Sequence, residues 1–150
     1  MNDVLHVYLE TSALVGIYRQ ERFSSQVLSI VSDAPLPIVL TQLSLVEFDS
    51  AVARLVRAGD LTEARAAHVE KIFSGHIREG LFRIEPIMES VFWHARDWVS
   101  KRDTPLRTLD SLHLSSARLL GCLLVTGDQV LAKAAARFEL PCTLLGIMST

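Results

Sequence analysis

The 150-residue sequence lacks several features that identify common classes of protein. Its two cysteines, Cys122 and Cys142, lie far apart in apolar surroundings, without the CxxC or Cys/His spacing of a zinc site. We therefore expect reduced core thiols rather than a disulfide or a metal centre. The longest uninterrupted apolar stretch, 119–125, is also much shorter than the roughly 20 residues of a membrane-spanning helix. These absences predict a protein of a reducing compartment, the cytoplasm, with no membrane partner.

Other absences concern known chemistries. The sequence has no Gly-rich phosphate loop, no GxSxG nucleophile elbow and no HExxH helix, and its five histidines are scattered without ligand spacing. The first twenty residues lack a cationic start followed by an apolar run, which predicts no secretory signal. The net charge of −2 argues against a protein that grips nucleic acid over its whole surface. A nuclease with a locally basic groove is still compatible with this charge.

Hydrophobic residues, in contrast, are abundant and make up 49% of the chain. Short apolar runs alternate with stretches of helical period, which favours a parallel sheet covered by helices on both faces. No linker, repeat or low-complexity segment divides the sequence, so we expect one domain over residues 1–150. Strands are predicted at 4–9, 38–41, 82–84, 122–125 and 142–145. Helices are predicted at 12–18, 24–32, 43–58, 62–79, 88–101, 108–120 and 128–138.

Four acidic residues are placed where such a fold would bring them together. Parallel sheets bind ligands beyond the carboxyl ends of their strands, and Glu10 and Asp128 follow two predicted strands. Glu47 lies on an apolar stripe of its helix, where a carboxylate is costly unless it is paired or coordinates a metal. Asp110 lies on a similar stripe in a first helical turn. A Mg²⁺ or Mn²⁺ ion bound by such carboxylates can hold a phosphate and lower the pKa of an attacking water.

Each of these acids has a structural alternative when it is considered alone. Asp128 is a suitable N-cap for the helix that follows it. Asp110 is a first-turn acid that would complement a helix dipole. Glu10 would be a strand-end residue in solvent. The metal-site interpretation therefore depends on the joint placement of the acids and not on any one of them.

The alternative for Glu47 is a buried ion pair with an arginine such as Arg54 or Arg107. His113 lies three residues after Asp110 on the same helix. We expect it to be a core residue, or a residue that supports the ligands, rather than a metal ligand.

Four segments of the sequence resemble the motifs of PIN-domain proteins, in the order found in that family. The segments are VYLETSALVGIY with Glu10, LSLVEFDSAVARL with Glu47, LRTLDSLHLSSARLLG with Asp110 and LLVTGDQVLAKAAARF with Asp128. Together they span residues 4 to 145, which is almost the whole chain. The resemblance implies an α/β fold, a three-layer α/β/α sandwich with a central parallel sheet of four or five strands.

The resemblance also implies a Mg²⁺- or Mn²⁺-dependent endoribonuclease. The implied catalytic acids are Glu10, Glu47, Asp110 and Asp128, of which Glu10, Asp110 and Asp128 are the implied metal ligands. The implied supporting hydroxyls, which would orient carboxylates or water, are those of Thr11, Ser12 and Thr126. Small stand-alone members of this length are similar to the toxins of VapBC-type toxin–antitoxin pairs. The partners implied are an RNA substrate, an antitoxin that blocks the acidic site, and a second copy of the chain.

One position departs from the family pattern, because the first acid is ordinarily Asp and here is Glu10. The extra methylene lengthens the side chain by about 1.5 Å, and a misplacement of about 1 Å can cost on the order of 10²-fold in rate. An alternative is therefore a catalytically weakened PIN-like module that binds protein or RNA. A third alternative is a metal-dependent phosphatase, although the second Asp of the aspartyl-phosphate phosphatases is missing.

Surfaces for RNA and for partner proteins are also predicted. Phosphate contacts need basic side chains near the acids, and the candidates are Arg19, Arg22, Lys101, Arg102 and Arg107. The last three form the predicted RNA-facing loop, whose alternative is a solvated charged loop. The predicted helices at 43–58 and 62–79 are apolar enough to offer a groove to an antitoxin or a second subunit.

The predicted helix at 88–101 has one apolar stripe that we expect to be buried. The residues of this stripe are Met88, Val91, Phe92, Ala95, Trp98 and Val99. Trp93 lies off the stripe and is either a partner contact or buried against a neighbouring helix.

Overall fold

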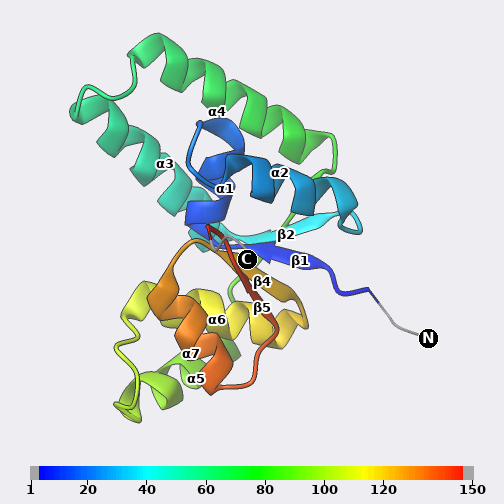
Figure 1. The fold of residues 1–150 in the computed structure, drawn as a ribbon, viewed down its shortest axis with the longest axis vertical. Helices are drawn as coiled ribbons and strands as arrows, with labels where there is room; N and C mark the ends of the chain where they lie inside the picture. Colours follow the sequence, from blue (N-terminus) through cyan, green and yellow to red (C-terminus); the bar gives the residue numbers. More distant parts are fainter. Residues whose placement is uncertain (1–3, 147–150) are drawn as a thin grey trace.

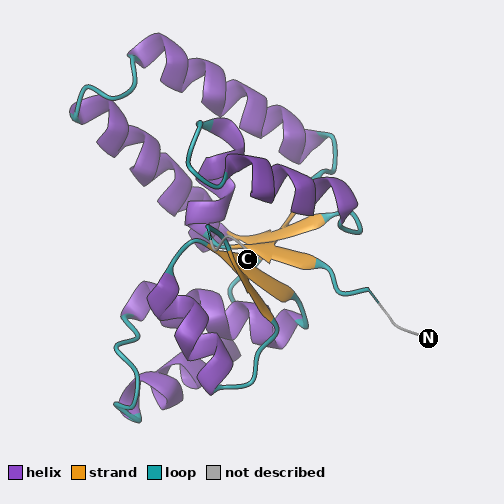
Figure 2. Cartoon of the chain, viewed as in Figure 1, coloured by secondary structure: helices purple, strands orange, loops and turns teal. Residues whose placement is uncertain are grey.

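The chain folds around a five-stranded parallel sheet, and the computed structural model describes residues 4–146. The strands are β1 (Val7–Leu9), β2 (Ile38–Thr41), β3 (Phe82–Glu85), β4 (Leu123–Thr126) and β5 (Cys142–Leu144). They lie in the order β3-β2-β1-β4-β5, so β1 is central, and Tyr8 is in register with Val39 on β2 and Leu124 on β4. Figure 2 shows the sheet between two groups of helices.

The seven helices of the described chain form two layers. Helices α1 (Thr11–Tyr18), α2 (Ser24–Asp33), α3 (Gln42–Arg57) and α4 (Glu63–Arg78) cover one face of the sheet (Figure 1). Helices α5 (Glu89–Ser100), α6 (Thr108–Leu120) and α7 (Gln129–Arg137) cover the other. The predicted three-layer α/β/α sandwich with a parallel sheet is confirmed.

Each layer closes its own hydrophobic core against the sheet. Successive side chains of a strand point to opposite faces, so Val7 and Leu9 join the core under α1–α4 while Tyr8 joins the core under α6 and α7. In the first core the rings of Phe48 and Phe73 pack with centroids 4.4 Å apart. β1 is thus buried on both faces, and the residues that follow it directly lie between the two layers.

The predicted element boundaries agree closely with the structure, with one clear exception in the first strand. The prediction began at Val4, whereas β1 begins at Val7, the residue in register with Leu123 of β4. Val4 precedes the sheet and has no strand to pack against, so it is 73% exposed. The end of α6 follows its sequence signal, because Gly121 has a φ of 65° and closes the helix in the left-handed conformation.

Helix α5 is where the predicted burial is wrong in part. The buried residues of its stripe are Val91, Ala95 and Trp98, while Met88, Phe92 and Val99 are exposed. A helix that packs mainly on one neighbour, α6, buries only a narrow stripe of side chains, and the flanking positions stay in solvent. Trp93 is also exposed, and its Nε1 donates a hydrogen bond to Glu89 Oε1 at 3.2 Å. No helix within residues 4–146 has the length and apolar character needed to cross a membrane.

Candidate active site

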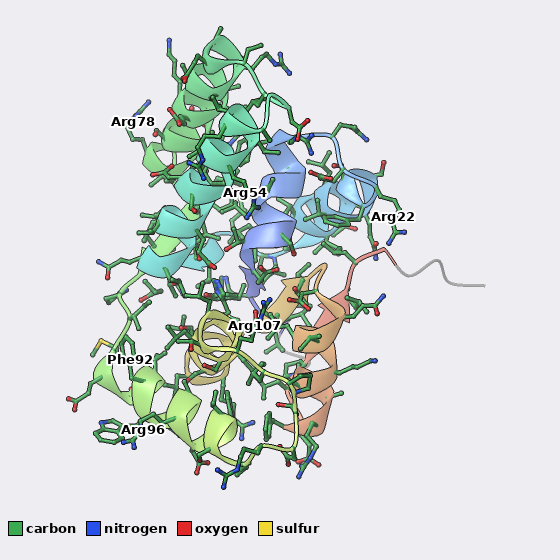
Figure 3. All side chains as sticks on the ribbon, turned by 90° about the vertical axis from the view of Figure 1, so that its left-hand side faces the viewer. Arg22, Arg54, Arg78, Phe92, Arg96 and Arg107 are labelled. Carbon is green, nitrogen blue, oxygen red and sulfur yellow. The ribbon has the colours of Figure 1, made fainter. Side chains whose placement is uncertain are left out.

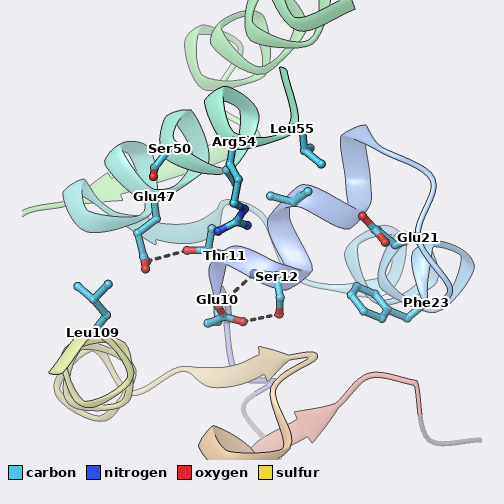
Figure 4. A pocket seen from close by; sticks show the side chains of 12 residues that line it. Glu10, Thr11, Ser12, Glu21, Phe23, Glu47, Ser50, Arg54, Leu55 and Leu109 are labelled. Atoms are coloured by element: carbon cyan, nitrogen blue, oxygen red, sulfur yellow. Dashed lines mark hydrogen bonds between the residues drawn. The ribbon is translucent and has the colours of Figure 1, made fainter. Parts of the chain in front are cut away.

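A cavity of about 510 Å³ opens beyond the carboxyl end of β1, between α1 and α3 (Figure 4). Both helices begin directly after a strand, as the parallel topology requires, so their first turns face the same edge of the sheet. The polar side chains that line the cavity are those of Glu10, Thr11, Ser12, Glu21, Glu47, Ser50 and Arg54. Two of the four predicted acids, Glu10 and Glu47, therefore share one cavity.

Glu10 is the N-cap of α1 and is held by three hydrogen bonds. Its Oε1 accepts from the Ser12 backbone N–H at 3.1 Å, which satisfies a free donor of the first helical turn. Its Oε2 accepts from Ser12 Oγ at 2.5 Å and from Thr126 Oγ1 at 2.8 Å. The carboxylate therefore joins the start of α1 to the end of β4, and it does not extend freely into solvent.

The same hydroxyls continue the network into the loop after β4. Ser12 Oγ accepts from the Gly127 N–H at 2.9 Å, and Thr126 Oγ1 accepts from the Asp128 N–H at 3.0 Å. A Cβ at Gly127 would lie 3.0 Å from the ring of Phe23, which forms part of the cavity wall. The predicted supporting hydroxyls Ser12 and Thr126 thus contact Glu10 directly.

Glu47 is held by residues that are distant in sequence. Its Oε1 accepts a hydrogen bond from Thr11 Oγ1 at 2.7 Å and also contacts His113 Nε2 on α6. On the far side of the imidazole, His113 Nδ1 lies 2.6 Å from the hydroxyl of Tyr8. The predicted alternative partners of Glu47, Arg54 and Arg107, form no ion pair with it among the described residues. His113 is 1% exposed, in agreement with the expected core position, while its contact with Glu47 was not predicted.

The ionisation of Glu47 follows from this environment. Partial burial raises the pKa of the carboxyl group, but the hydrogen bond and charge of His113, together with the Thr11 hydroxyl, lower it by more. The net pKa of Glu47 is below its usual value, so the group is a carboxylate at neutral pH. Burial raises the pKa of the Tyr8 hydroxyl, which keeps the phenol protonated as a hydrogen-bond donor.

Asp110 and Asp128 lie at the N-termini of α6 and α7, outside the set of residues that line the cavity. Asp110 Oδ2 accepts from the Arg107 N–H at 3.4 Å and lies 3.6 Å from the Arg107 Nε. Asp128 Oδ1 accepts from the N–H groups of Val130 and Leu131, at 2.8 and 3.3 Å. Within residues 4–146, no group of three or more Asp, Glu, His or Cys side chains is arranged to hold a metal ion. The structure thus assembles a pair of acids at the cavity and leaves the other two as helix caps.

The donor chemistry of these acids nevertheless fits a hard divalent cation. One oxygen each of Glu47, Asp110 and Asp128 accepts no hydrogen bond from the described part of the chain. Free carboxylate oxygens are the ligands that Mg²⁺ and Mn²⁺ prefer. Glu10 differs, because both of its oxygens already accept hydrogen bonds.

Arg54 is the basic residue at the cavity, and it was not among the predicted RNA contacts. Arg54 lines the cavity from α3, two turns after Glu47, and forms no ion pair within residues 4–146 (Figures 3 and 4). Of the predicted RNA contacts, Arg107 is at the start of α6 beside Asp110. Lys101, at the end of α5, is paired with Asp97 at 3.3 Å.

Arg102, the third residue of the predicted RNA-facing loop, follows α5 and is exposed, with a φ of 58°. Neither it nor Lys101 lines the cavity. The sequence signal that could have placed Arg54 near the acids is its position on α3, because a residue seven positions after Glu47 lies on the same helical face.

The sequence matches the PIN domain family over residues 7–137, and the chain belongs to this family. No match was found among curated protein sequences. Among solved structures, the chain is similar to the Mycobacterium tuberculosis VapC20, described as a sarcin-ricin loop cleaving toxin. The two have a TM-score of 0.63 and 15% identity over 85% of this chain and 94% of that one.

Two further solved structures have the same fold. One is VapBC2 from Rickettsia felis bound to a promoter DNA fragment, with a TM-score of 0.67 and 14% identity over 94% of this chain and 99% of that one. The other is a toxin–antitoxin complex from Klebsiella pneumoniae, with a TM-score of 0.53 and 15% identity over 81% of this chain and 86% of that one. At these identities the similarity shows a common fold.

Proposed function

We propose that the protein is a Mg²⁺- or Mn²⁺-dependent endoribonuclease and the toxin of a cytoplasmic toxin–antitoxin pair. The observation that carries this proposal is a PIN-domain chain whose Glu10 and Glu47 line one cavity at the carboxyl edge of its sheet. The similar solved structures include a sarcin-ricin loop cleaving toxin and a toxin–antitoxin complex, which supports the same function. The phosphatase alternative receives no such support from the family.

Glu10, Asp110 and Asp128 are the residues that would hold the metal ion, and Glu47 would complete the site. A bound divalent cation would neutralise the carboxylates and polarise the phosphodiester group of the substrate. The free oxygens of Asp110 and Asp128 support their assignment as ligands. Thr11 keeps the Glu47 carboxylate at the cavity.

Arg54 is the residue that we propose for contact with the RNA backbone. Its guanidinium lies in a cavity lined otherwise by acids, hydroxyls and apolar groups, so it is the cation available there for a phosphate (Figure 4). Arg107, 83% exposed beside Asp110, is the second candidate. Lys101 and Arg102 would then contact RNA only outside the cavity.

The proposed partners are an antitoxin that covers the acidic cavity and a second copy of the chain. Exposed apolar residues support a protein–protein contact on α5, namely Phe92 and Trp93 of the helix and Met88, its N-cap. Large exposed apolar side chains gathered on one helix are unusual on a monomer and typical of interfaces.

Substitution of Asp110 tests the nuclease proposal most directly. Asp110→Asn preserves the size of the side chain but removes its charge, so we expect cleavage of RNA with added Mg²⁺ or Mn²⁺ to be abolished. The matched control is Asp33→Asn, an exposed acid at the end of α2 that belongs to none of the four motifs and has no side-chain hydrogen bond or ion pair in the described chain. Equal cleavage by wild type and Asp110→Asn would assign the activity to another site or to a contaminant.

The alternative, a weakened PIN module that binds RNA or protein, is favoured by the environment of Glu10. Both of its oxygens are used to cap α1 and to bind Thr126, so they are less available as metal ligands. Glu10→Asp separates the two proposals. A large increase in cleavage would identify a nuclease weakened at one ligand, whereas RNA binding without cleavage by either protein would favour the module.

A further inference from the structure

A buried chain of hydrogen bonds runs from the cavity into the centre of the fold. It begins at Glu47 Oε1, passes through both nitrogens of His113 to the Tyr8 hydroxyl, and reaches Thr41 Oγ1, 3.2 Å from the Tyr8 hydroxyl. Its members come from α3, α6, β1 and the end of β2. Tyr8, Thr41 and His113 are each at most 1% exposed. The Glu47 side chain, 21% exposed, is the only member in contact with solvent.

The chemistry of the groups fixes which nitrogen of His113 donates to Glu47. The Glu47 carboxylate can only accept, so the proton on the imidazole must be on His113 Nε2. A neutral ring then accepts at Nδ1 from the Tyr8 hydroxyl, whereas a protonated ring donates from Nδ1 to the Tyr8 oxygen. The Tyr8 and Thr41 hydroxyls form the next hydrogen bond, in which either oxygen can be the donor. In both protonation states Nε2–H points to Glu47, so the contacts on both sides fix the orientation of the imidazole.

These contacts make the two carboxylate oxygens of Glu47 unequal. The Thr11 hydroxyl and the imidazole both bind Oε1, and no residue of the described chain donates to Oε2. The side chain is therefore held by one oxygen while the other stays available to the cavity. Without His113, the hydrogen bond from Thr11 would be the sole restraint on a side chain with several rotatable bonds.

We infer that His113 is a positioning residue, which holds the Glu47 carboxylate at the cavity, and that Tyr8 fixes the imidazole that does so. The inference deepens the proposed nuclease function and rests on it for the effect on RNA cleavage. Residues that orient catalytic carboxylates from behind typically affect activity by about 10–100-fold. His113 is expected to act within this range.

The fold contains a natural comparison for this arrangement. Tyr18 and His76 form a second pair, with the Tyr18 hydroxyl 2.7 Å from His76 Nδ1. This pair is only partly buried and, within residues 4–146, His76 Nε2 contacts no carboxylate. A Tyr–His hydrogen bond of ordinary structural function is therefore available as a control in the same molecule.

The first test compares two conservative variants of His113. Glutamine places its amide nitrogen near the position of Nε2 and can still donate to Glu47, whereas asparagine is too short to reach it. We expect His113→Asn to lower kcat for RNA cleavage by about 10–100-fold with little change in KM. His113→Gln should restore most of this loss, and His76→Asn should leave kcat unchanged. Equal kcat values for His113→Asn and His113→Gln, at equal stability, would overturn the inference.

A second measurement is independent of activity. Long-range proton–nitrogen NMR spectra of the imidazole should show a proton on His113 Nε2 that exchanges slowly with water. Glu47→Ala should make this proton exchange rapidly, while the His76 signals stay unchanged. An Nδ1–H tautomer, or slow exchange that persists in Glu47→Ala, would overturn the inference. If wild-type protein cut no RNA, the nuclease proposal would fail, and these spectra would still decide whether His113 holds Glu47.

Discussion

Glu10 and Glu47 line the same cavity, but different kinds of structure hold them. Glu10 is bound by Ser12, two residues away, and by Thr126 at the end of the neighbouring strand. Glu47 is bound by His113, which comes from the opposite helical layer and is 66 residues away in the sequence. The first carboxylate therefore depends on a helix cap, and the second depends on the packing of both layers on the sheet. Changes at Glu47 should consequently affect stability more than changes at Glu10.

The largest expected effect comes from removing each carboxylate in turn. Glu47→Ala leaves the buried His113 Nε2–H without its acceptor, so we expect the free energy of unfolding to fall by about 1–3 kcal/mol. Glu10→Ala removes an N-cap, which typically costs about 1 kcal/mol. Urea denaturation of both variants at pH 7 measures the difference. A greater loss for Glu10→Ala would contradict the comparison.

Low pH should reduce the stabilisation that the Glu47 carboxylate gains from His113 and Thr11. Because the pKa of folded Glu47 is below its usual value, its charge stabilises the fold at pH values above that usual value, and this stabilisation disappears as the pH falls through the lower, folded pKa. Glu47→Gln lacks this ionisation. We expect the difference in unfolding free energy between wild type and Glu47→Gln to be largest near pH 7 and to shrink in acid. A difference that stayed constant between pH 7 and pH 3 would refute the assignment.

The smallest effect is expected at the hydroxyls that hold Glu10. Thr126→Val keeps the shape of the side chain but removes the group that donates to Glu10 and accepts from the Asp128 N–H, at a cost of about 1 kcal/mol. In the double variant with Ser12→Ala, we expect the loss of unfolding free energy to be smaller than the sum of the two single losses, because both hydroxyls bind Glu10 Oε2. Thr143→Val on β5, where no side-chain hydrogen bond is lost, is the matched control. Strict additivity would show that the two hydroxyls act separately.

The sequence predicted those parts of the fold that depend on local patterns. The strand 38–41 and the helix 108–120 were predicted with the observed bounds, because apolar runs and a C-terminal glycine mark them clearly. Burial on α5 was predicted less well. The period of a helix indicates which residues share a face, but the width of the buried stripe depends on how many neighbours pack against it, and Phe92 and Val99 are left exposed.

For the site, the sequence by itself determined which acids stand at strand ends and helix starts. Glu10 and Asp128 follow β1 and β4, and the first turns after parallel strands must meet at one edge of the sheet. The hydrogen-bond partners were decided only by the tertiary structure. Glu47 is bound by His113 instead of an arginine because the strand order places β1 at the centre of the sheet. There α3 and α6 approach the same edge from opposite faces, and a contact of this kind leaves no periodic signal in the sequence.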